Sequence, residues 1–374
     1  MERYFATVAR GLEAVAAAEL EHLGAERIEA AFAGVQFQGD RALLYRVNLW
    51  ARTIFRVLVP IGEFAAPDRE RLYRAVQKID WQRYVPMEAT LAVDATGGNA
   101  RLNHTHFTAL QVKNAIVDQQ RDRTGRRSSV DAHRPDVRLN IHIDNDRAVL
   151  SLDSSGESLH RRGYRPAMGA APLKETLAAA LIELAGWDPA QAFIDPLCGS
   201  GTLPLEAAIK ALAIAPGLFR DRFGFEGWPD FDRPLWERLR TEAKSVQRTQ
   251  LPAPIAGSDS DVEVLQLARE NARRCGVQKL VAWSATELAH LEAPSDRGVI
   301  LCNPPYGERL GEASALGELY STLGDVFKQR FKGWQAGILT GNRELAKQIG
   351  LRPARRLPVF NGALACTLLL YELY

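Results

Sequence analysis

The tetrapeptide Asn303-Pro304-Pro305-Tyr306 contains the residue types that methylation of a planar amine requires. The exocyclic amine of a nucleobase is a poor nucleophile because its lone pair is delocalised into the ring, so a catalyst must hold the base flat and draw the amine protons out of plane. The Asn303 side-chain oxygen can accept one N–H and the Pro304 carbonyl the other, because proline has an acceptor but no competing donor. Tyr306 offers a π-face on which the base can stack.

The residues before this motif predict where it lies. The apolar run at 299–302 is typical of a buried parallel strand. The motif would then follow the carboxyl end of the strand, where open α/β sheets bind ligands. The alternative is a rigid proline turn that only ends the strand, since Asn and Pro are ordinary turn residues.

A second motif, at residues 195–202, leaves one predicted strand and enters a helix. Gly199 and Gly201 allow a tight turn and a close approach of the backbone to a ligand, and the helix N-terminus offers N–H groups to a carboxylate. The segment has neither the Gly-Lys-Ser/Thr of a phosphate-binding loop nor the three spaced glycines of a dinucleotide site. It therefore favours a cofactor that contains an amino acid, and the alternative is a plain strand-to-helix corner.

An acidic residue, Asp259, ends the next predicted strand. An acid at this position can accept hydrogen bonds from ribose hydroxyls, as in other nucleoside-binding sheets. Asp261 is equally suited to cap the following helix, which is also the alternative role of Asp259.

The pattern of elements predicts an α/β protein whose two halves differ in the order of their helices and strands. From residue 192 onward, short apolar strands alternate with helices, which indicates a mainly parallel, Rossmann-like sheet. The runs 355–360 and 363–370, joined by Asn361-Gly362, predict an antiparallel hairpin at one edge. The first half mixes helices and strands as small α+β units do, with helices expected at 12–23 and 107–120 and strands at 53–59, 90–94, 137–143 and 148–152.

Together these motifs resemble class I S-adenosylmethionine-dependent methyltransferases, and specifically the RlmL-type enzymes that methylate guanine N2 in RNA. Three further segments share the resemblance: 159–165, 171–175 and 226–228. The resemblance implies a ferredoxin-like α+β piece at 1–60, a THUMP RNA-binding domain at 61–160 and a class I methyltransferase catalytic domain at 161–374.

The resemblance also implies roles for individual residues, with S-adenosyl-L-methionine as the cofactor. Asn303, Pro304 and Tyr306 would bind the target amine and its base, and Asp259 would bind the cofactor's ribose. Ser284 occupies the place of an Asp that usually bonds the cofactor's adenine, and it cannot supply a carboxylate. The methionine end falls on Asp195, Cys198, Gly199 and Gly201, with Lys174 and Glu175 nearby.

Arginine-rich stretches between residues 113 and 165 predict a surface for RNA. Arginine pairs bidentately with phosphate and stacks on bases. The alternative is a solvated face, because Asp118, Asp122, Asp131 and Asp136 dilute the charge. The predicted RNA-binding residues are Lys113, Arg121, Arg126, Arg127, Arg161, Arg162 and Arg165.

A segment rich in aromatic residues, at 219–236, has two interpretations. It could form a lid over the target base. The favoured interpretation is that its aromatic side chains pack a long loop onto the methyltransferase domain.

Composition limits the other classes of function. The net charge is only +2, so any contact with nucleic acid must come from a local basic patch. The four cysteines are far apart and His104-Thr105-His106 lacks a third ligand, so we expect no zinc site, no other metal and no disulfide framework. No signal peptide or membrane span is expected, which favours a cytoplasmic protein.

The expected function is S-adenosylmethionine-dependent methylation of guanine N2 in RNA, with 23S ribosomal RNA preferred to transfer RNA. Methylation of adenine N6 stays open as an alternative, since the same tetrapeptide serves that chemistry. Cytosine C5 methylation would need a cysteine nucleophile, and Cys302 is interpreted as a packing residue. An RNA-binding module without activity is the remaining alternative. The sequence predicts no oligomeric state.

Overall fold

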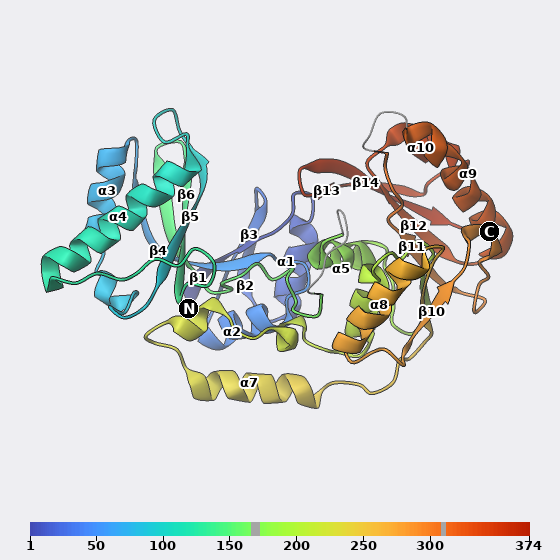
Figure 1. The fold of residues 1–374 in the computed structure, drawn as a ribbon, viewed down its shortest axis with the longest axis horizontal. Helices are drawn as coiled ribbons and strands as arrows, with labels where there is room; N and C mark the ends of the chain where they lie inside the picture. Colours follow the sequence, from blue (N-terminus) through green and yellow to red (C-terminus); the bar gives the residue numbers. More distant parts are fainter. Residues whose placement is uncertain (166–172, 308–311) are drawn as a thin grey trace.

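The computed structural model describes residues 1–165, 173–307 and 312–374. Within these residues the strands form two seven-stranded sheets, one from the first half of the chain and one from the second. The two sheets lie one after the other along the long axis of the molecule (Figure 1).

The first sheet is continuous across both predicted N-terminal units, because one strand belongs to both. Strand β4, ten residues long, pairs with β1 at its start, through residues 56–58, and with β7 from residue 58 onward. The order is β2-β3-β1-β4-β7-β6-β5. The strands are β1 (Glu2–Thr7), β2 (Glu26–Ala31), β3 (Gly34–Gly39), β4 (Arg56–Ala65), β5 (Leu91–Gly98), β6 (Val137–Asp144) and β7 (Arg147–Asp153).

Local signals explain where several helices of the first half begin and end. Asp40 and Asp68 each accept a backbone N–H of the helix that follows, and Gly125 ends the longest helix in a left-handed conformation with φ 71°. The apolar sides of these helices pack on the first sheet in two core clusters. The helices are α1 (Glu13–His22), α2 (Arg41–Trp50), α3 (Arg69–Gln77) and α4 (Thr105–Thr124), with a short 3-10 turn, η1 (Trp81–Arg83).

The second sheet confirms the predicted Rossmann-like class and its closing hairpin. Its order is β10-β9-β8-β11-β12-β14-β13, parallel through β12 and antiparallel beyond it. From β8 the chain adds strands on one side as far as β10, and from β11 it adds them on the other side. The boundary between β8 and β11 is therefore the switch point of the strand order, which is where such sheets bind ligands. The strands are β8 (Ala192–Asp195), β9 (Ile255–Asp259), β10 (Val281–Ala285), β11 (Gly298–Cys302), β12 (Gln335–Thr340), β13 (Arg355–Asn361) and β14 (Leu364–Glu372).

Helices cover both faces of this sheet. Apolar residues of α5, α6 and α8 pack against one face and those of α9 and α10 against the other. Both faces are thereby buried, so β11 is an apolar run without alternation. The helices are α5 (Glu175–Leu184), α6 (Thr202–Ala211), α8 (Val262–Arg274), α9 (Glu312–Arg330) and α10 (Arg343–Gln348), with a 3-10 turn, η4 (Leu288–His290).

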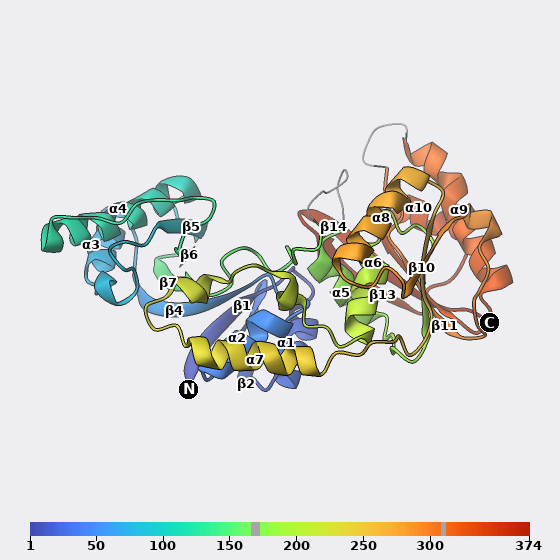
Figure 2. The same ribbon diagram turned by 60° about the horizontal axis from the view of Figure 1, so that its bottom comes forward.

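The aromatic segment packs mainly against the first half of the chain, whereas the favoured interpretation placed it on the methyltransferase domain. It begins at the last residue of η2 (Pro216–Phe219) and contains η3 (Gly224–Gly227) and the start of α7 (Arg233–Ser245), which lies along α2 (Figure 2). Phe225 stacks on Tyr45 of α2, with ring centroids 4.3 Å apart, and Trp236 meets Phe225 edge-on at 5.0 Å. The second half of the chain is therefore fastened to the first by a shared core.

Candidate functional site

The ends of three neighbouring strands bring the predicted site segments to one edge of the second sheet. β8 ends at Asp195 and β9 at Asp259, and β11 ends directly before Asn303. All three strands run parallel and in register, with Ile194 opposite Ile300 and Asp195 opposite Gly257. The loops that follow them therefore lie at the same edge, on both sides of the switch point.

The loop after β8 is shaped by its two glycines. Gly199 and Gly201 both have left-handed φ values, 51° and 84°. The Cys198 N–H donates to the Ser258 carbonyl at 2.9 Å, and the Gly199 N–H donates to Asp259 Oδ2 at 2.9 Å. No side chain caps α6, so its N-terminal N–H groups can face an anion such as a carboxylate.

The two carboxylates at this edge lie in different environments. Asp259 is half-buried and accepts N–H groups at both oxygens, from Gly199 and from Asp261 at 3.1 Å. Each oxygen keeps a second lone pair that can accept a ribose hydroxyl. Burial raises the pKa of Asp195 well above its usual range, and the Asp259 charge adds to the shift. A cationic ligand at this edge would favour the charged form of Asp195.

A hollow lined by residues of β8, β9 and β10 and of the segment after β10 could take the nucleoside part of a cofactor. Ser258, Ser284, Thr286 and His290 are among the residues that line it. The Ser258 hydroxyl is buried and has no hydrogen-bond partner in the described part of the chain, so it is available to a ligand. Together with the glycine loop and Asp259, this orphaned hydroxyl fits a nucleoside that bears an amino acid.

The structure also places Ser284 relative to the end of its strand. Ser284 lies inside β10, opposite Ser258, and the strand continues to Ala285. The first carboxylate after the strand belongs to Glu287, which precedes η4 and is exposed. The expectation that Ser284 holds the place of the Asp that usually bonds the adenine stays a prediction.

The turn after β11 holds Asn303 in a fixed orientation. The Tyr306 hydroxyl donates to Asn303 Oδ1. The Tyr320 hydroxyl donates to the Pro305 carbonyl at 3.2 Å, and Asn342 Nδ2 donates to the Tyr306 carbonyl at 3.2 Å. The Pro305 carbonyl thus faces the protein, and no such bond reaches the Pro304 carbonyl from the described residues.

Burial determines the protonation of the groups around this turn. Burial raises the pKa of Tyr306 far above its usual range, so its hydroxyl stays protonated and remains a donor to Asn303. Burial likewise raises the pKa of Cys302, which is fully buried in the core. A buried thiol of this kind is unsuited to act as a nucleophile, so the environment of Cys302 disfavours cytosine C5 chemistry.

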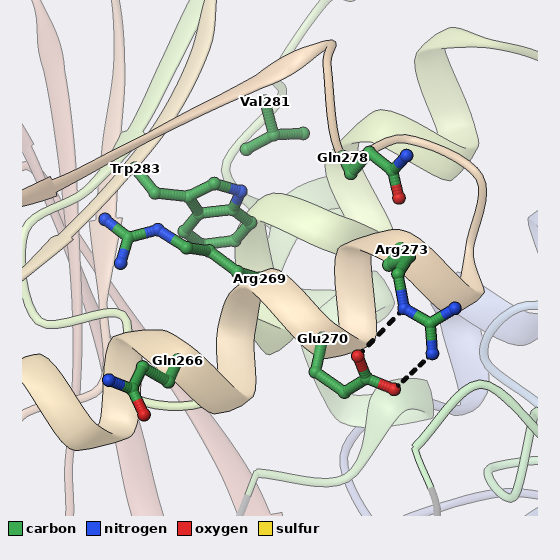
Figure 3. Close-up of a pocket in the computed structure, with 7 residues that line it drawn as sticks. All are labelled: Gln266, Arg269, Glu270, Arg273, Gln278, Val281 and Trp283. Atoms are coloured by element: carbon green, nitrogen blue, oxygen red, sulfur yellow. Dashed lines mark hydrogen bonds and ion pairs between the residues drawn. The ribbon is translucent and has the colours of Figure 1, made fainter.

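Trp283 supports the glycine loop, a role that the sequence analysis did not assign. A Cβ added to Gly201 would lie 2.7 Å from the Trp283 indole, and one added to Gly257 would lie 2.6 Å from it. The indole therefore occupies the space that a side chain at either position would need, so both positions require glycine. Its outer edge lines a shallow depression between α8 and β10, where Glu270 and Arg273 form an ion pair at 2.7 Å (Figure 3).

Two of the arginines predicted to bind RNA are buried, and that prediction is wrong for them. The Arg162 side chain is 1% exposed and pairs with Glu206 at 3.4 Å. The Arg165 side chain is 2% exposed, pairs with Glu175 at 3.1 Å and donates to the Thr202 hydroxyl. Neither guanidinium can reach a phosphate on the surface.

The other predicted RNA-binding residues lie at or near the surface. Arg121, Arg126 and Arg127 are exposed at and beyond the end of α4, and Lys113 is half-buried on the same helix. Arg121 pairs with Asp118 at 3.7 Å and Arg126 with Glu88 at 3.0 Å, which reduces their net field. A contact of this surface with RNA stays a prediction.

The segment before α5 is only partly described. Ala171 and Pro172 lie outside the described residues. Glu175 is buried in the first turn of α5, where it pairs with Arg165. Lys174 precedes it, and its Nζ lies 5.3 Å from the centre of the Phe55 ring.

Comparison with known proteins identifies the family. Residues 162–369 match the model described as RMKL-like, methyltransferase domain. A Synechocystis protein named "Putative RNA methyltransferase slr0064" is 57% identical over 371 residues, which cover 99% of this chain and 97% of that protein. The chain belongs to the RMKL-like methyltransferase family. Residues 66–153 match the THUMP domain and residues 3–58 the RlmL ferredoxin-like domain.

Other relatives agree with this methyltransferase assignment. A protein of Syntrophotalea carbinolica named ribosomal RNA large subunit methyltransferase K/L is 46% identical over 382 residues, which cover 99% of this chain and 53% of that protein. The chain thus spans about half the length of the K/L relatives. The crystal structure of "SMU.472, a putative methyltransferase complexed with SAH" superposes with a TM-score of 0.89 at 34% identity, covering 100% of this chain and 98% of that one.

These findings establish an RNA methyltransferase that uses S-adenosylmethionine. The THUMP match and the RNA methyltransferase relatives point to RNA as the partner. Among the described residues, no helix is long and apolar enough to cross a membrane. The same residues contain no group of three or more His, Cys, Asp or Glu side chains that could hold a metal ion.

Proposed function

We propose that this methyltransferase modifies the N2 amine of guanine in ribosomal RNA, in the cytoplasm. One observation is central to the proposal. Asn303 follows β11 at the switch point, next to the glycine loop of β8, and the Tyr306 hydroxyl fixes its side-chain oxygen. A planar amine held there would face the cofactor loop.

The chain supplies orientation more than chemical activation. Bound S-adenosylmethionine supplies a strongly electrophilic methyl group. Asn303 Oδ1 has a second lone pair for one amine N–H, and the Pro304 carbonyl accepts the other, so the amine lone pair turns toward the methyl donor. Tyr306 combines this support of Asn303 with a half-buried ring on which the base could stack. The base must enter unpaired, because a paired guanine would have its amine engaged.

Names of relatives support ribosomal RNA as the substrate. The K/L relatives, at 41% to 46% identity, are named for the large ribosomal subunit. Transfer RNA guanine N2 and adenine N6 are the competing targets. The test uses the purified chain with S-adenosylmethionine labelled in its methyl group and separated ribosomal and transfer RNA. We expect label in the ribosomal fraction, and label confined to transfer RNA would overturn the substrate assignment.

Replacing Asp259 tests the proposed ribose contact. Asp259→Asn should weaken binding of S-adenosylhomocysteine by about 10-fold or more, since a hydrogen bond to a charged group contributes about 1.5 to 3 kcal/mol. Calorimetric titration measures the affinity. Asp261→Asn is the matched control, because Asp261 is exposed and caps α8. Equal affinities for the two variants would remove Asp259 from the cofactor site.

A further inference from the structure

Three half-buried side chains meet where the two halves of the protein join. Phe55 precedes β4, His160 lies in the connection after β7, and Lys174 precedes α5. The Lys174 Nζ lies 5.3 Å from the centre of the Phe55 ring, and the His160 ring meets Phe55 edge-on at 6.0 Å. The Leu159 N–H donates to the Phe55 carbonyl at 2.7 Å, which ties the connection to β4. One aromatic ring thus positions both polar groups.

This cluster lies at the same edge of the second sheet as Asn303. Helix α5 leads into β8 and packs beside α6, so its N-terminus lies at the carboxyl edge of the strands. Arg165 connects the first turns of the two helices, since it pairs with Glu175 and donates to Thr202. Helix α5 lies between the first sheet and the second sheet (Figure 1).

The cluster is positively charged and only partly compensated. Burial, followed by the charges of Lys174, Arg161, Arg162 and Arg56, lowers the pKa of His160 to about 4. Arg162 and Arg56 are paired with Glu206 and Asp153, and Arg161 pairs with the exposed Glu157. Lys174 has no carboxylate within 4.0 Å among the described residues.

A neutral imidazole beside an uncompensated ammonium matches one ligand chemistry. A phosphodiester is an anion that accepts hydrogen bonds, and Lys binds it as a compact point charge. The His160 Nδ1 lies 2.8 Å from the Ser158 hydroxyl, which leaves Nε2 for the ligand. In the tautomer with its proton on Nε2, the imidazole donates an N–H to a second phosphate oxygen without adding a charge to the cluster. The site is half-buried, which weakens screening by salt compared with an open surface.

We propose that Phe55, His160 and Lys174 form a phosphodiester-binding subsite for the RNA strand next to the target base. The inference rests on the proposed function, since it needs RNA as substrate. It assigns Lys174 to RNA and not to the methionine end of the cofactor. The subsite would hold the RNA backbone in place, and the Asn303 turn would hold the target base.

The salt dependence of RNA binding tests the assignment of Lys174. A contact with one phosphate adds about 0.7 to the slope of log affinity against log salt for a single strand, so Lys174→Ala should lower the slope by about that amount. A labelled single-stranded RNA oligonucleotide is titrated with the full chain at several salt concentrations. The matched control is Lys332→Ala, because Lys332 is exposed between α9 and β12, at the opposite edge of the sheet, and should leave the slope unchanged.

Two further readouts separate the assignments. The affinity of Lys174→Ala for S-adenosylhomocysteine should equal that of the native chain. The His160 pKa, followed by NMR in the native chain, should rise from about 4 when the oligonucleotide is added, because a phosphate stabilises the imidazolium. An unchanged salt slope, or a loss of cofactor affinity in its place, would overturn the subsite. If the native chain methylates RNA in that case, the proposed function stands without it.

Discussion

Asn303→Ala should reduce the rate of methyl transfer by about 100-fold or more, because misplacing a reacting group by about 1 Å can cost that much. The variant loses the oxygen that accepts one amine proton, while the glycine loop and Asp259 stay intact. Affinity for S-adenosylhomocysteine should therefore stay nearly unchanged. Single-turnover kinetics measure the rate, and calorimetry measures the affinity.

Tyr306→Phe is the matched variant for this prediction. It keeps the ring and removes only the hydroxyl that donates to Asn303 Oδ1. The Asn303 amide would then be free to rotate but would still be present, so the rate should fall less than in Asn303→Ala. If Asn303→Ala loses rate and cofactor affinity to the same degree, Asn303 is a structural residue and the orientation role is wrong.

Glu206→Leu should destabilise the fold by about 3 to 5 kcal/mol, since breaking a buried ion pair leaves an uncompensated charge in the interior. The Glu206 and Arg162 side chains are 0% and 1% exposed, and Tyr164 also donates to Glu206 at 3.0 Å. Urea unfolding followed by circular dichroism measures the change.

The matched control for this stability prediction is Glu242→Leu on α7. Glu242 pairs with Arg238 at 3.8 Å, but both side chains are more than 60% exposed. Such a surface pair contributes at most about 1 kcal/mol. Equal losses in Glu206→Leu and Glu242→Leu would show that the buried pair does not stabilise the fold.

The buried pair also lies where it can influence the site. Glu206 is on α6, the helix that follows the glycine loop, and Arg162 donates to the carbonyls of Ala51 and Leu159 in the first half of the chain. The pair thus joins the helix that follows the glycine loop to the part of the protein that contains the THUMP domain. We expect Glu206→Leu to weaken cofactor binding in addition to stability.

The sequence predicted that the candidate motifs meet at one edge of the sheet, because they directly follow apolar strands. The short apolar runs before Asp195 and Asn303 favour buried strands, which the structure confirms, and parallel strands place their carboxyl ends together. The burial of Arg162 and Arg165 could not be predicted in this way. Their partners, Glu206 and Glu175, lie on helices that come 10 or more residues later in the chain. A local run of cations has the same composition whether its side chains are solvated or buried.

Two other features depend on contacts between distant segments. The strand β4 pairs with β1 at its start and with β7 beyond it, so it unites two units that local patterns describe separately. The support of the glycine loop by Trp283 depends on the close approach of an indole to Gly201 and Gly257. Neither the alternation of a strand nor its composition reports such a contact.

The identity of the methylated nucleoside tests the central claim most directly. The purified chain is incubated with ribosomal RNA and S-adenosylmethionine carrying a deuterated methyl group, and the RNA is then digested to nucleosides for mass spectrometry. The proposed function predicts deuterium in N2-methylguanosine, and none when Asn303→Ala replaces the native chain. Deuterium in N6-methyladenosine, or in no nucleoside, would contradict it.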